Sequence, residues 1–228
     1  MVAPSTLRLA PKKSAECKPV LLTGFDPFGG DPVNPSWLAA RALHRRRLAG
    51  HPVLAAQLPT QFGASLARLR ALLAEHRPAL VICLGLAASR SALSLERVAI
   101  NVDDARIADN AGAQPIDMPV VADAPTAYFS RLPIKSMHAA IQAGGVAVEV
   151  SQTAGTFVCN HVFYGLMHHL ASTRGFARTR GGFIHVPPLP EQAAHGMPLA
   201  QMVEGLCIGI RTALTVKHDA RRGAGAID

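Results

Sequence analysis

Short apolar runs rich in β-branched residues alternate along the chain with longer segments whose apolar residues recur at helical spacing. The short runs predict buried strands at residues 19–23, 53–58, 80–84, 95–102, 146–150 and 182–187. The longer segments predict helices at residues 65–76, 134–143, 160–170 and 199–216, and Asn34-Pro35 is a typical start for one more. This alternation predicts an α/β fold, a single-domain three-layer α/β/α structure with a mainly parallel twisted sheet.

The chain shows no internal repeat and no linker, and its 228 residues with 49% hydrophobic content suffice for one full core. We therefore expect one α/β domain over residues 19–217, flanked by a disordered basic tail at 1–18 and a second disordered tail at 218–228. The longest apolar stretch, residues 79–88, is too short to span a bilayer. Residues 1–18 contain no apolar core of a secretory signal, so the expected location is cytoplasmic, without a membrane partner.

A formal net charge of +8 raises the question of nucleic-acid binding. The arginines are scattered apart from two short runs, residues 45–47 and 221–222, and aromatic residues make up only 5% of the chain. Single-strand and base-stacking sites combine a basic groove with aromatic platforms, which this pattern lacks. The sequence therefore predicts no nucleic-acid partner.

Four cysteines occur without CxxC pairing or metal-ligand spacing, which favours free thiols in a reducing compartment. Cys159 stands out because Ala154-Gly155 ends the strand at 146–150 and an amphipathic helix follows from Asn160. A sulfur in the first turn of a helix lies where unpaired N–H groups and the helix dipole favour an anion. This placement predicts a lowered thiol pKa and a nucleophile. The alternative is an inert buried thiol.

A cysteine nucleophile needs a base, and ten histidines compete for that role. His185 lies in a short buried strand that Pro187 redirects, although a structural role would place a histidine there as well. His161 and His168 share one face of the helix after Cys159, which raises a metal site as an alternative. No third ligand or HExxH motif accompanies them, so no metal is predicted.

Glu96 stands within an apolar run, where a carboxylate is costly unless it is paired or hydrogen-bonded. One interpretation is a salt bridge with a neighbour such as Arg97 or Arg106. The other is a carboxylate that orients His185 and stabilises its imidazolium form.

Several candidate residues follow the carboxyl ends of predicted strands, where α/β folds form their sites. They are Phe25, Phe28, Arg90, Cys159 and His185. We expect them to lie close together.

Four blocks of the sequence resemble the pyroglutamyl peptidase type I (pyrrolidone-carboxylate peptidase) family of cytosolic cysteine peptidases. The resemblance covers residues 19–216 and rests on residues 22–37, 85–101, 151–160 and 183–187. It implies that Cys159 is the nucleophile, His185 the general base and acid, and Glu96 the orienting carboxylate. It further implies release of N-terminal pyroglutamate from peptides through a thioester, with no cofactor or metal. Phe25, Phe28, Phe157 and Val158 would hold the lactam ring, and the protein would form a homo-oligomer such as a homotetramer.

One segment departs from the family pattern. Members commonly show Gly-Gln-Ala-Gly-Gly-Arg where this chain has Gly85-Leu-Ala-Ala-Ser-Arg90, so Leu86 replaces a glutamine. This replacement leaves two alternatives open. The same three residues would act on a different small cyclic or acyl amide, or the chain would be a weakly active homologue that binds pyroglutamyl peptides.

Overall fold

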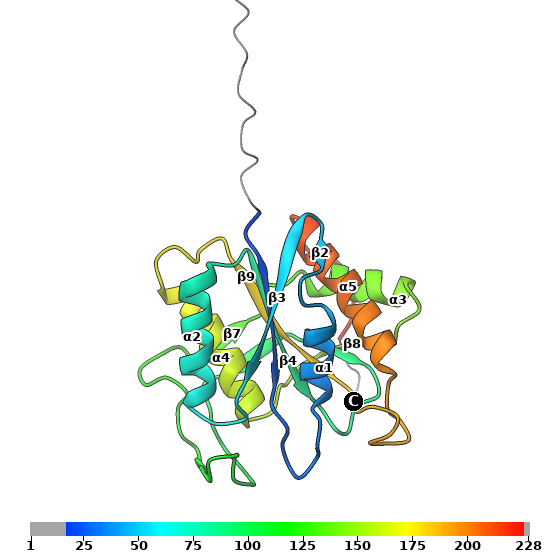
Figure 1. Cartoon of the computed structure of the whole chain (residues 1–228). Coiled ribbons are helices and arrows are strands. Elements are labelled where there is room, and N and C mark those ends of the chain that lie inside the picture. The colour runs from blue at the N-terminus through cyan, green and yellow to red at the C-terminus, as the bar shows by residue number, and fades with distance from the viewer. Residues whose placement is uncertain (1–16, 226–228) are drawn as a thin grey trace, which may run out of the picture.

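The computed structural model describes residues 17–225, in which a seven-stranded sheet forms the centre of the fold (Figure 1). The strands of this sheet lie in the order β2-β3-β1-β4-β9-β5-β8. Their bounds are β1 Val20–Phe25, β2 Arg47–Leu48, β3 His51–Leu58, β4 Leu80–Leu86, β5 Leu93–Glu96, β8 Val148–Ser151 and β9 Arg180–Val186. A separate two-stranded sheet pairs β6 Val98–Ile100 with β7 Ala127–Phe129.

Most neighbouring strands run parallel, as the sequence predicts. The pairs β3–β1, β1–β4, β4–β9 and β5–β8 are parallel, whereas β2–β3 and β5–β9 are antiparallel. The reversal at β5 matters for the site because its register pairs Ser94 with His185. Glu96, two residues further on, projects from the same sheet face as Ser94 and is a diagonal neighbour of His185.

Within residues 17–225, five helices cover the two faces of the sheet, which confirms the predicted three-layer α/β/α fold. They are α1 Pro35–Ala42, α2 Ala64–His76, α3 Ile134–Ala143, α4 Val158–Ser172 and α5 Leu199–Thr215. Helices α1, α3 and α5 pack on one face and contribute to one apolar cluster, while α2 and α4 pack together on the other (Figure 1). Asn34 caps α1 by accepting a hydrogen bond from the Ser36 N–H, and Pro35 is the first helical residue.

The differences from the predicted elements concern short strands. The predicted strand at 95–102 is interrupted at Arg97, which separates β5 from β6. Strands β2, β6 and β7 have only two or three residues each, too few for an alternating pattern to be recognised in the sequence.

The predicted N-terminal tail falls almost entirely on residues 1–16, outside the described part, as do the last residues, 226–228. Within the expected C-terminal tail, the Asp219 carboxylate accepts hydrogen bonds from the N–H groups of Lys135 and Ser136, at 3.0 and 2.8 Å. Asp219 thereby caps the start of α3, whose own N-cap residue, Pro133, provides no side-chain bond. Among the described helices, none is both long and apolar enough to cross a membrane.

Candidate active site

Cys159 is the second residue of α4, which begins at Val158, so the thiol lies in the first helical turn as predicted. The N–H groups of a first turn have no acceptor within their own helix. The groups at the start of α4 can therefore donate to an anion that forms beside the sulfur. The loop before α4 bends at Gly155, which has a φ of +75°, a left-handed conformation that favours glycine.

The sulfur of Cys159 lies directly over Gly85 in the sheet. A Cβ atom placed on Gly85 would be 2.7 Å from the Cys159 Sγ and 2.8 Å from the Phe183 ring, so only glycine leaves room for the thiol. Gly85 is also the residue of β4 that pairs with His185 of β9. Because paired residues of adjacent strands are about 4.8 Å apart and project from the same face, this pairing places His185 on the face of the sheet that the sulfur covers.

Glu96 is fully buried at the end of β5, where it binds the imidazole of His185. The Glu96 Oε1 lies 2.8 Å from the His185 Nδ1, which leaves the Nε2 of the ring available for the thiol. The same oxygen accepts a 2.6 Å hydrogen bond from the Arg90 guanidinium. A carboxylate with no solvent exposure is expensive unless it is paired, and here it has both a cation and a hydrogen-bonding ring.

Arg90 is therefore the ion-pair partner of Glu96, in place of the sequence candidates Arg97 and Arg106. A second guanidinium nitrogen of Arg90 donates to the carbonyl of Thr153 at 2.9 Å. Thr153 belongs to the loop that leads into Cys159, so one side chain joins the orienting carboxylate to the segment that carries the thiol. This contact gives Arg90 a positioning role that its place in the sequence did not reveal.

The expectation of a lowered pKa for Cys159 is wrong. Burial, followed by the negative charge of Glu96, raises the pKa of this thiol to about 12, and the positive charge of Arg90 offsets only part of the effect. The thiol form therefore predominates at neutral pH. A sulfur nucleophile at this position needs a base that removes its proton as it attacks, which is a role suited to His185.

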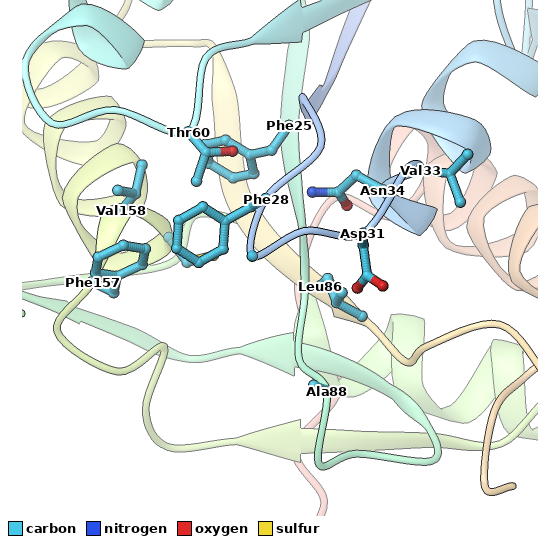
Figure 2. Close-up of a pocket in the computed structure, with 12 residues that line it drawn as sticks. Phe25, Phe28, Asp31, Val33, Asn34, Thr60, Leu86, Ala88, Phe157 and Val158 are labelled. Carbon is cyan, nitrogen blue, oxygen red and sulfur yellow. The ribbon is translucent and has the colours of Figure 1, made fainter. Parts of the chain in front are cut away.

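A cavity of about 310 Å³ opens beside the thiol and brings the predicted ring-binding residues together (Figure 2). Phe25, Phe28, Phe157 and Val158 all line it, as do Leu86 and Ala88 from the segment that departs from the family pattern. The Phe28 and Phe157 rings pack with their centroids 5.4 Å apart and form an apolar wall. Such a wall suits a flat, uncharged ring.

His161 packs against this wall indirectly, through the Phe62 ring. Its Nδ1 lies 2.7 Å from the Asp103 carboxylate, and its Nε2 accepts a 3.0 Å hydrogen bond from the Gly63 N–H. Its ring packs edge-on against Phe62, which packs edge-on against Phe157. With both ring nitrogens engaged, His161 has a structural role, and its former metal-site companion His168 contacts the Tyr128 hydroxyl instead. Among residues 17–225, no group of three or more His, Cys, Asp or Glu side chains could hold a metal.

The sequence did not single out Asp31 or Thr60, which also line the cavity. Thr60 follows the carboxyl end of β3, so the rule that placed Phe25 at this edge could have found it. Its N–H donates to the Asp26 carboxylate at 2.7 Å, which ties the loop after β3 to the loop after β1. Asp31 lies in the glycine-rich loop, where nothing local distinguishes it from a solvated turn residue.

The close approach of the Cys159 sulfur to Gly85 leads to a testable prediction. In Gly85→Ala, the added methyl group displaces the sulfur, and we expect kcat to fall by about 10²-fold because misplacement by one ångström is that costly. Steady-state kinetics on the substrate that the sequence resemblance implies, normalised to the folded fraction, measures this change.

Gly181→Ala is the matched control for this substitution. Its methyl group would meet Leu170 in the same apolar core, away from the thiol. It should lower the unfolding free energy, by about 1–3 kcal/mol, while kcat stays near the wild-type value. Equal kcat losses in the two variants would show that crowding of the core, not the position of the sulfur, limits the rate.

Together, the fold and this site define a class of protein. A cysteine at a helix start, next to a histidine held by a buried carboxylate, is the arrangement of an α/β cysteine hydrolase. Comparison with known proteins gives the family. The pyroglutamyl peptidase family model matches residues 18–216, and the chain belongs to this family.

Individual relatives agree with this assignment along nearly their whole length. The chain is 56% identical over 213 residues to a pyrrolidone-carboxylate peptidase of Cupriavidus taiwanensis, covering 91% of this chain and 98% of that protein. The crystal structure of pyroglutamyl peptidase I from Bacillus amyloliquefaciens superposes with a TM-score of 0.88 at 43% identity, covering 91% of this chain and 100% of the other. The pyrrolidone carboxyl peptidase from Thermococcus litoralis gives a TM-score of 0.85 at 32% identity, covering 90% and 99%.

Proposed function

We propose that this protein is a cysteine omega-peptidase that hydrolyses the amide bond after an N-terminal pyroglutamyl (5-oxoprolyl) residue. Cys159 is the nucleophile, His185 the general base and acid, and Glu96 the carboxylate that orients the imidazole. The single observation that carries this proposal is the position of the Cys159 sulfur over Gly85, next to a histidine whose Nδ1 is fixed by a buried carboxylate.

Acylation begins when His185 takes the thiol proton as the sulfur attacks the pyroglutamyl carbonyl carbon. The carbonyl oxygen becomes an oxyanion, which accepts hydrogen bonds from the free N–H groups at the start of α4. Glu96 stabilises the imidazolium. Collapse of the tetrahedral intermediate breaks the C–N bond, and His185 returns the proton to the leaving amine. The product is a shortened peptide and a pyroglutamyl thioester on Cys159.

In deacylation, His185 again acts first as base and then as acid, with water as the nucleophile and the Cys159 sulfur as the leaving group. His185 removes a proton from a water molecule, which attacks the thioester carbonyl. The C–S bond breaks, the thiolate of Cys159 regains a proton from His185, and pyroglutamate leaves. Every proton in the cycle passes through one imidazole, so the raised pKa of Cys159 is compatible with turnover.

The apolar lining of the cavity supports selectivity for a lactam. Pyroglutamate has no charged amino group, whereas an N-terminal proline has a similar ring with a protonated nitrogen, which is costly to bury next to Phe28 and Phe157. The test compares pyroglutamyl and prolyl reporter amides. We expect release from the first only. Release from the prolyl reporter alone would favour a different cyclic substrate, and binding without release would favour an inactive homologue.

Leu86 is expected to be compatible with lactam recognition, because it lies away from Phe157 in the cavity (Figure 2). Leu86→Gln should change kcat/KM for a pyroglutamyl coumarin amide by less than about threefold. By contrast, Phe28→Ala removes part of the apolar wall and should lower kcat/KM by about tenfold. Parallel kinetics of the two variants measure the difference. A tenfold gain in Leu86→Gln would instead show that the glutamine side chain recognises the ring.

Two properties implied by the family resemblance stay predictions, namely a cytoplasmic location and assembly into a homo-oligomer such as a homotetramer. Exposed large apolar side chains support the second, and four of them lie on the long loop after β6 and on β7: Ile107, Ile116, Met118 and Phe129. Such surface is more common at interfaces than on monomers. Light scattering of the purified protein measures the mass of the assembly.

A further inference from the structure

The cavity beside Cys159 has two chemically different halves. The aromatic half contains Phe25, Phe28 and Phe157, whereas Asp31, Val33 and Leu86 lie on the other side of Phe28 (Figure 2). Asp31 and Val33 also line a second cavity of about 620 Å³, together with Pro32, Leu189, Glu191, Gln192 and Leu199. Because they share Asp31 and Val33, the two cavities adjoin. The name outer cleft is used for the second cavity together with Asp31, Val33 and Leu86 on its side of Phe28.

Contacts between loops hold the walls of the outer cleft in place. The Gln192 amide donates a hydrogen bond to the Val33 carbonyl at 3.4 Å and accepts one from the Leu189 N–H at 3.0 Å. His195, in the same loop, contacts the Ala88 carbonyl through its Nε2 at 2.8 Å. The loops after β1, β4 and β9 are thus tied to one another before any ligand binds.

The outer cleft is acidic, although the chain has a formal net charge of +8. Asp31 and Glu191 are the charged residues that line the two cavities, and no lysine, arginine or histidine of the described chain does so. Within residues 17–225, no side chain or backbone group forms a hydrogen bond or ion pair with the Asp31 carboxylate. Asp31 therefore presents an uncompensated negative charge next to the apolar side chains of Val33 and Leu86.

In amide cleavage the two halves of the cavity would hold different parts of the substrate. The aromatic half would hold the pyroglutamyl ring, and the other half the peptide that leaves with the amine. With the lactam ring against Phe28 and Phe157, the carbonyl carbon lies at the Cys159 sulfur. The leaving amine and the peptide beyond it must then extend away from the aromatic wall. The outer cleft lies on the side of Phe28 opposite to Phe157 and so offers a lined surface to that part of the peptide.

We propose that the outer cleft binds the residues that follow pyroglutamate and favours basic side chains there. The methylene stem of an arginine or lysine packs on Leu86 and Val33, and its cationic head pairs with Asp31. Glu191 gives the same preference one residue further along the peptide. This inference rests on the proposed function and names its preferred substrates as pyroglutamyl peptides with a basic second or third residue.

The test compares pyroglutamyl-arginine amide with pyroglutamyl-citrulline amide, which has nearly the same shape and no charge. We expect the wild-type protein to cleave the arginine compound with a kcat/KM about three- to fivefold higher, the range of a partly exposed ion pair. The preference should shrink at high salt because the charges are exposed. In Asp31→Asn, the ratio should fall to about one.

Glu75→Gln is the matched control, since it removes an exposed carboxylate of α2 that lines neither cavity, and it should keep the wild-type ratio. For the next position, pyroglutamyl-alanyl-arginine amide and its citrulline counterpart should lose their difference in Glu191→Gln. Cleavage of all compounds at equal rates, or a ratio that Asp31→Asn does not change, would overturn the outer-cleft proposal and leave the proposed function intact. Cleavage of none of them by the folded protein would contradict the proposed function itself.

Discussion

Replacing Cys159 with alanine is expected to lower kcat/KM for a pyroglutamyl reporter by at least about 10⁴-fold. The variant retains the cavity, the helix N–H groups and the Glu96–His185 pair, but no atom remains to form the thioester. Cys159→Ser should be nearly as inactive, because an alcohol at this position is a much weaker nucleophile than sulfur. Rates of fluorophore release at saturating and at limiting substrate concentration give kcat and kcat/KM for both variants.

Cys207→Ala is the matched control for this loss. Cys207 is a half-buried free thiol on α5, which packs on the face of the sheet opposite to α4. Its removal should leave kcat/KM within about twofold of wild type, and thermal unfolding should show that both Cys159 variants stay folded. Wild-type turnover by either Cys159 variant would exclude this residue as the nucleophile.

Glu96→Gln is the second substitution with a large expected effect. The amide retains the shape of the side chain but no longer neutralises the imidazolium, and it can present a donor to the His185 Nδ1, which disturbs the tautomer. The corresponding change in serine peptidases costs about 10⁴-fold, so we expect kcat to fall by 10²- to 10⁴-fold. KM should change little, since Glu96 does not line the cavity.

Measuring stability alongside kcat separates two roles of Glu96, which are orienting the His185 imidazole and stabilising the folded protein. Glu96→Gln also removes the ion-pair partner of Arg90, which should lower the unfolding free energy by about 1–3 kcal/mol. Glu149→Gln is the control, because Glu149 lies 4.0 Å from the same Arg90 nitrogen but does not contact His185. A kcat near wild type in Glu96→Gln, with the protein folded, would show that the carboxylate serves structure only.

The sequence predicted the fold well because its main elements have strong local signals. Residues 134–143 were predicted as a helix and form one, since Ile134, Met137 and Ile141 recur at helical spacing and face the core. The direction of β5 was not predictable, because strand orientation depends on the long connections and not on the strand residues themselves. That orientation is what places Glu96 next to His185.

Two properties of the candidate site depend on contacts between distant segments and could not be predicted from local sequence. The position of Cys159 in the first turn of α4 was predicted from Gly155 and the helix after it, but its raised pKa depends on burial by other segments of the chain. In the same way, adjacency in the sequence makes Arg97 a candidate partner for Glu96. The turn between β4 and β5 brings Arg90 there instead. Desolvation and ion pairing are tertiary properties that spacing along the chain does not encode.

The most direct test of the central claim is release of a fluorophore from a pyroglutamyl amide by the wild-type protein, followed in parallel with alkylation of its thiols. Peptide mapping identifies which cysteine is modified at each time point. We expect release by the untreated protein and a loss of activity that matches modification of Cys159, with no loss when only Cys17 has reacted. No release by the folded protein, or release that persists after Cys159 is fully alkylated, would contradict it.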